Sequence, residues 1–210
     1  ATLDALNGRE LRSLQQASVV GARFWDDALA ALDPGAAEQL PGLHRRQLTL
    51  LQAHSAFTGT HEYAFRHHLL HQVTYDTVLK SDRRLAHARA ARWLQDQAQG
   101  RETELASQIA EHLERAGSTR QAVIYWLRAA EDAAQREADL VALRHADRAL
   151  ALDDGSDLRR GLRLHRVRAD VYRRQGQADA HVQALDTMEA LSEHIGDDVL
   201  RLQVAFDRVW

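Results

Sequence analysis

The stretch from Glu62 to Leu94 constrains the fold more than any other part of the chain, because the spacing of its apolar residues changes within it. Tyr63 and Phe65 are two residues apart, which places both side chains on one face of a β-strand. After Phe65, Leu69 and Val73 follow at four-residue steps, the spacing of an α-helix. No proline occurs after Phe65. The sequence therefore predicts a strand that leads directly into a helix and then into a wholly helical region.

Residues 1–66 have a different character, with short elements and several breaks. Both prolines of the chain, Pro34 and Pro41, lie here, and neither fits the interior of a helix. Residues 26–32 are predicted to form a short helix, and a turn at Gly59 is predicted to join two short extended segments as a hairpin. Helices followed by a hairpin are what a winged helix needs, so we expect a winged-helix-like module over residues 1–66.

Glycines separate the helices predicted after this module. Residues 67–100 are predicted to be junction helices, and residues 101–210 to be helical repeats. Helix starts recur about every 19 residues, roughly half the 34-residue period of tetratricopeptide (TPR) repeats. The segment 139–152 has the spacing of small residues that is typical of the second helix of such a repeat: Ala142, Ala146 and Ala149, with Leu150. The expected fold is mostly α, a winged-helix-like module followed by a TPR-like right-handed α-solenoid of helical hairpins.

Composition excludes several classes of partner and site. The formal net charge of −3 gives no broad attraction to nucleic acid or to an anionic membrane. The chain has no cysteine, so it contains no disulfide and no thiolate site, as is typical of a protein of the reducing cytoplasm. No run of 18 apolar residues occurs, and we expect no membrane partner. The chain starts at Ala1 and ends at Trp210 inside a predicted helix, so we expect a piece of a longer protein.

Three segments of the chain resemble one known family. The first segment, residues 65–87, combines a strand end, a pair of leucines and two spaced pairs: Phe65, Arg66, His67, Leu69, Leu70, Val73, Tyr75, Arg83 and His87. The second, residues 109–117, reads IAEHLERAG, and the third, residues 17–29, reads ASVVGARFWDDAL. Together they resemble the bacterial STAND-type ATPases, in which such a block joins a winged-helix module to TPR-like repeats. Many of those proteins carry a class III nucleotide cyclase domain at the N-terminus.

The sequence itself offers no catalytic, cofactor-binding or metal site. Its single lysine, Lys80, has no glycine-rich loop before it. If the parent protein is an ATPase, as the resemblance implies, its nucleotide-binding loop lies upstream. His67, His68 and His71 could place two imidazoles on one metal ion, but no third ligand accompanies them, and we expect them to pack at the junction. His87 lies on an apolar helix face and is predicted to be a core histidine, as is His165.

Four arginines are the candidate partner-binding residues. Arg159, Arg163, Arg166 and Arg173 lie at offsets of 0, 4, 7 and 14, on one face of a predicted helix. Guanidinium groups at this spacing could hold the carboxylates of an acidic peptide, or a phosphate. The alternative, which the pattern alone favours, is a solvated face balanced by nearby acidic residues: Asp147, Asp153, Asp154 and Asp170. Elsewhere, Arg45 and Arg46 lie where a winged helix could enter a DNA groove, but two arginines make a weak footprint, and we do not expect nucleic acid as a partner.

Three functions remain open. The resemblance implies a non-catalytic regulatory or sensor region that controls an upstream ATPase domain, and in some proteins a cyclase, when its repeats bind a protein, a peptide or a small ligand. A passive TPR scaffold for peptide binding is the second hypothesis. The repeat region of a transcription activator is the third.

Overall fold

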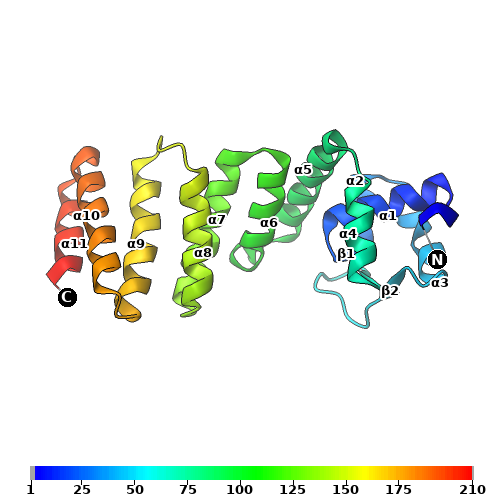
Figure 1. Cartoon of the computed structure of the whole chain (residues 1–210), viewed down its shortest axis with the longest axis horizontal. Coiled ribbons are helices and arrows are strands. Elements are labelled where there is room, and N and C mark those ends of the chain that lie inside the picture. The colour runs from blue at the N-terminus through cyan, green and yellow to red at the C-terminus, as the bar shows by residue number, and fades with distance from the viewer. Residues whose placement is uncertain (1–2, 210) are drawn as a thin grey trace. The chain divides into compact units, whose positions relative to one another are not determined.

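The computed structural model describes residues 3–209 of the chain, which are mostly helical with one small three-stranded sheet (Figure 1). Ala1 and Trp210, which the sequence analysis used, lie outside the described residues. Two compact units are distinguished. The first extends to residue 99 and also contains residues 112–117, and the second contains residues 100–111 and everything from residue 118 onward. The predicted junction, residues 67–100, therefore lies almost wholly in the first unit.

Among the described residues, the first unit contains five complete α-helices, two short 3-10 helices, the sheet and the last residues of α6. Its elements are η1 (Leu3–Ala5), α1 (Gly8–Val20), β1 (Arg23–Trp25), α2 (Asp26–Leu32), η2 (Ala37–Gln39), α3 (Leu40–Arg45), β2 (Thr49–Leu51), β3 (Glu62–Phe65), α4 (His68–Asp76) and α5 (Lys80–Gln97). Helix α1 starts at a capping box, in which the Asn7 side chain accepts from the backbone of Glu10 while the Glu10 carboxylate accepts from the backbone of Asn7.

The sheet has the strand order β1-β3-β2, and both pairs are antiparallel. Strands β2 and β3 form the predicted hairpin, whose connection contains Gly59 with a φ of +82°. The segment 23–25, for which the sequence predicts no strand, supplies β1, and Phe24 stands opposite Tyr63 on β3 with stacked rings. The predicted helix over residues 26–32 is confirmed as α2.

An aromatic cluster fixes α5 to the sheet of the first unit. The Trp25 ring stacks on Trp93 of α5 with centroids 5.3 Å apart, and Phe57, from the β2–β3 connection, meets both rings edge-on. Behind this cluster, the buried Glu62 carboxylate accepts hydrogen bonds from Trp25 Nε1 at 3.3 Å and from the Ala56 backbone at 3.1 Å. These bonds offset the desolvation of the carboxylate. The sheet, its connecting loop and α5 thus share one core.

A chain of buried hydrogen bonds crosses the same unit. The Tyr75 hydroxyl lies 2.9 Å from His87 Nε2, and His87 Nδ1 lies 2.8 Å from His112 Nδ1. His112 also hydrogen-bonds the backbone of Val20, the last residue of α1, whose carbonyl has no partner within the helix. Because the two Nδ1 atoms lie within hydrogen-bond distance, one ring donates from Nδ1 and the other accepts. The prediction of His87 as a core histidine is confirmed by its exposed fraction of 1%.

The second unit consists of successive helices joined by short turns. They are α6 (Glu102–Ala116), whose residues up to 111 belong to this unit, α7 (Thr119–Gln135), α8 (Asp139–Leu152), α9 (Leu158–Arg174), α10 (Ala178–Ile195) and α11 (Asp198–Val209). From α7 to α11 each helix packs against the next and reverses direction at each turn, and α7 also touches α9 (Figure 1). Gly196 ends α10 in the left-handed conformation that glycine favours.

Small residues let these helices approach closely. Ala142, Ala146 and Ala149 of α8 are completely buried, as their spacing predicted. Further along, Met188 and Leu185 of α10 pack with Leu162 of α9 and Val204 of α11 in one apolar cluster. None of the helices among residues 3–209 is both long and apolar enough to cross a membrane.

The buried histidine pair should make the stability of the first unit depend on pH. Burial lowers the pKa of His87 to about 3 and that of His112 to about 4, with Arg115 adding to both effects. Below pH 6.5 the unfolded chain takes up protons that the folded chain excludes, so stability is full above pH 6.5 and is lost as the pH falls toward 4. We expect a loss of about 1.4 kcal/mol per pH unit from each histidine.

Urea unfolding at pH 7.5 and pH 5, followed by the near-ultraviolet circular dichroism of the stacked Trp25–Trp93 pair, measures this loss. His112→Gln should roughly halve the pH dependence. The same change at exposed His54, outside this chain of hydrogen bonds, should leave it unaltered. If the free energy of unfolding of His112→Gln depends on pH as steeply as that of the unaltered chain, then His112 is not a source of the pH dependence.

Candidate partner-binding site

Helix α9 positions the arginines that the sequence analysis singled out. The helix begins where the Asp157 side chain accepts from the backbone of Arg160 at 3.1 Å. Two sides of the helix are buried: one carries Leu162 and Ala169, and the other carries Leu164 and Val167. The strongly amphipathic sequence turns the arginines toward a different side of the helix, where three of the four reach cavities.

Two cavities flank α9, and together they form what we call the α9 groove. The first has a volume of about 470 Å³ between α7 and α9, and the second about 230 Å³ among α9, α10 and α11. Arg166 and Asp170 line both cavities. Arg163 lines the first and Arg173 the second, whereas Arg159 lines neither. The structure thus brings three of the four predicted residues to one groove.

Three of the four arginines form ion pairs with carboxylates from neighbouring parts of the chain. Arg163 makes a bidentate pair with Glu131 of α7, with N–O distances of 2.8 and 2.6 Å. Arg166 reaches Asp207 of α11 at the longer distance of 3.4 Å. A third pair joins Arg159 to Asp197, in the turn before α11, at 2.9 Å.

The acidic residues that the sequence analysis named pair differently. Asp153 and Asp154 lie beside Arg160, and Asp147 lies 3.3 Å from Arg168. Acidic residues therefore do balance the arginines, as expected. The carboxylates that pair with the four candidate arginines, however, come from more distant parts of the chain.

Two guanidinium groups of the groove keep unused donors. The Arg173 side chain is exposed and makes no hydrogen bond or ion pair with any residue that the structure describes. Arg166 Nε is buried and lacks a hydrogen-bond partner among those residues. A buried donor without a partner costs free energy, and an incoming carboxylate or carbonyl oxygen would remove that cost.

Asp170 is the groove residue that the sequence analysis undervalued. It lies between the two cavities, one helical turn from Arg166. Burial raises the pKa of this carboxyl, Arg173 opposes the change, and the charge of Asp207 adds to it. Its position four residues after Arg166 was visible in the sequence, but its partial burial depends on α10 and α11 and had no sequence signal.

His181 lines the second cavity from α10. Its Nδ1 lies 2.9 Å from the Ala169 carbonyl, which can only accept, so the proton is on Nδ1 and Nε2 remains an acceptor. The groove therefore offers arginine donors, a carboxyl group and an imidazole acceptor. The groove also has an apolar floor at Leu185 and Met188. Together these groups suit recognition of a peptide that has both polar and apolar side chains.

The remaining candidates do not form sites. His71 Nε2 donates to the Ser18 carbonyl at 2.9 Å, and no group of three potential metal ligands occurs within residues 3–209. Arg46, one of the two arginines considered for DNA contact, pairs with Glu10 at 3.2 Å. His165 was predicted to be a core histidine, but it is only half-buried. Its Nδ1 lacks a hydrogen-bond partner in the described chain.

Comparisons with known proteins give no relatives. No family model matches the chain, and no match was found among the curated proteins or among the solved structures.

The buried carboxyl of Asp170 leads to a prediction on stability. Because its folded pKa lies above the unfolded value of 3.8, the folded state binds more protons in that range, and stability falls as the pH rises through it. Asp170→Asn removes this loss and should raise the melting temperature of the second unit at pH 7 by roughly 1–3 °C.

Thermal unfolding monitored by circular dichroism at 222 nm checks this expectation. Glu193→Gln, an equivalent change at an exposed position of α10, is the matched control and should have almost no effect. A lower melting temperature for Asp170→Asn would mean that the attraction of Asp170 to Arg173 and Arg174 outweighs its desolvation.

Proposed function

We propose that the chain is a non-catalytic regulatory region whose second unit binds an acidic peptide segment of a protein partner in the α9 groove. The observation that carries this proposal is the convergence of Arg163, Arg166 and Arg173 on two adjoining cavities with an apolar floor. Peptide carboxylates would take the arginine donors, and apolar side chains would enter the cavities.

The existing ion pairs do not prevent such binding. The Arg163 side chain is 55% exposed within its pair, and exposed ion pairs contribute only about 0–1 kcal/mol. Exchange of Glu131 or Asp207 for a carboxylate of the partner therefore costs little. Arg173, which has no such pair in the described chain, offers a first point of contact.

The finer fold and the parent protein belong to the same proposal. Helices α7–α11 would be part of a TPR-like right-handed solenoid, supported by short turns and by the contact of α7 with α9. The first unit would be winged-helix-like, supported by helices α1–α3, the β2–β3 hairpin and the pairing of β1 on it. In a STAND-type ATPase, peptide binding would regulate an upstream nucleotide domain, and in cyclase-bearing proteins the cyclase.

A passive scaffold is the second candidate function. Helix α9 packs directly against α7, α8 and α10, which favours a groove of fixed shape. The third hypothesis, the repeat region of a transcription activator, has no support of this kind from the groove.

Binding of a fluorescein-labelled glutamate-rich peptide, measured by anisotropy, tests the groove. The double variant Arg166→Gln/Arg173→Gln should weaken binding about tenfold, since it removes two charge-assisted contacts. The control variant Arg120→Gln/Arg144→Gln changes charge equally at exposed positions outside the groove and should bind like the unaltered chain. If both variants weaken peptide binding equally, the peptide is bound by non-specific charge attraction and not by the α9 groove.

Hydrogen exchange distinguishes regulation from scaffolding. If the chain is regulatory, saturating peptide should change amide protection in α4 and α5 as well as in the groove, because a ligand shifts an equilibrium only when it binds two states unequally. Protection confined to α7, α9 and α11 would support the passive scaffold instead.

A further inference from the structure

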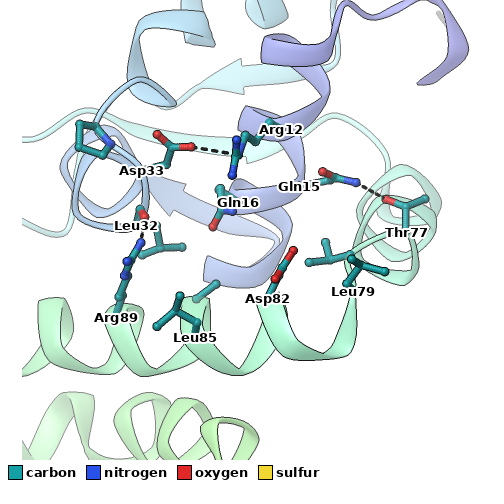
Figure 2. A pocket seen from close by; sticks show the side chains of 13 residues that line it. Arg12, Gln15, Gln16, Leu32, Asp33, Thr77, Leu79, Asp82, Leu85 and Arg89 are labelled. Atoms are coloured by element: carbon teal, nitrogen blue, oxygen red, sulfur yellow. Dashed lines mark hydrogen bonds and ion pairs between the residues drawn. The ribbon is translucent and has the colours of Figure 1, made fainter.

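The first unit contains a separate cleft between α1 and α5, with a volume of about 570 Å³ (Figure 2). Arg12 and Gln16 line it from α1, and Asp82, Leu85 and Arg89 line it from α5. Residues 32–34 close one end and residues 77–79 the other, as Figure 2 shows. We call this feature the α1–α5 cleft. Its volume lies within the range of small-ligand sites.

The two ends of the cleft carry opposite charge. At one end Arg12 is paired with Asp33 at 3.3 Å, which leaves Arg89 as the net positive group. Arg89 spends one donor on the Leu32 carbonyl, and a guanidinium has five. Toward the other end lies Asp82, which accepts from the Ser81 hydroxyl at 3.2 Å and has no cation paired with it in the described chain.

Helix geometry sets the spacing of these two residues along α5. Arg89 and Asp82 are two turns apart on one face of α5, which corresponds to about 10.5 Å along the helix axis. Figure 2 shows Leu85 between them, pointing into the cleft. Leu85 and Leu79 keep exposed fractions of 54% and 68%, so each offers apolar surface to a ligand.

A neutral polar group lies between the two charged ends. The Gln16 side chain is half-buried at the middle of the cleft in Figure 2 and makes no hydrogen bond with the described residues. Its amide has both donors and an acceptor, so it can bind a peptide group. Gln15, beside it, already donates to the Thr77 hydroxyl at 3.0 Å.

From these positions we infer that the α1–α5 cleft binds a short zwitterionic peptide of about three residues. An extended tripeptide spans about 10 Å, which is similar to the axial spacing of Asp82 and Arg89 on α5. Its carboxylate pairs with Arg89, its ammonium group with Asp82, and its amides with Gln16. Apolar side chains of the peptide cover Leu79 and Leu85. This inference does not rest on the proposed function, since it concerns other residues in the other unit.

Calorimetric titration of the full chain with the tripeptide Leu-Ala-Leu tests the inference. N-acetylation removes the ammonium charge and C-amidation removes the carboxylate, and each should weaken binding about three- to tenfold. Asp82→Asn should weaken binding of the free peptide by the same factor and leave binding of the acetylated peptide unchanged. Equal binding of the acetylated peptide to this variant and to the unaltered chain also shows that the variant is folded.

Matched controls lie on the same helix. Asp96→Asn and Arg92→Gln change exposed α5 residues outside the cleft and should bind Leu-Ala-Leu like the unaltered chain, as should Arg166→Gln/Arg173→Gln. Equal binding of the free and acetylated peptides would overturn the inference and indicate the C-terminus of a protein instead. Absence of binding at millimolar peptide would also overturn it.

Discussion

The hydrogen bond between His87 and His112 holds together parts of the first unit that are far apart in the sequence. It joins α5 to the last turn of α6, while Tyr75 and Val20 extend the contact to α4 and α1. Two Nδ1 atoms 2.8 Å apart can share only one proton, so each ring is held in one tautomer. The arrangement is stable only while the pair is not doubly protonated. Four helices thus depend on a contact that apolar packing alone would not specify.

The sequence predicted features that depend on local spacing and missed those that depend on distant partners. The helix over residues 26–32, the hairpin at Gly59 and the buried alanines of α8 all follow from periodicity or turn chemistry. Strand β1 was missed because three residues carry too little pattern to reveal a strand that β3 stabilises. The His87–His112 contact spans 25 residues of sequence, and nothing local signals it.

The candidate site shows the same division. Helical spacing alone grouped the arginines on α9, and the structure brings Arg163, Arg166 and Arg173 to the groove. The carboxylate partners of Arg163 and Arg166 lie 32 and 41 residues away, on α7 and α11. These pairs could therefore not be predicted from the sequence of α9 itself. The groove keeps a partly buried carboxyl at Asp170 and an unsatisfied donor at Arg166. Such locally unfavourable groups are common where a protein binds rather than merely folds.

Lys80, the first residue of α5, gives the first unit a chemical handle. It is the only lysine of the chain, it is exposed, and it follows Leu79 at the end of the α1–α5 cleft. All other basic side chains are arginines or histidines, which do not react with amine-directed reagents under mild conditions. A fluorophore or cross-linker with an activated ester would therefore label one internal position of known location. The composition that leaves the surface rich in guanidinium groups makes this protein selectively addressable without engineering.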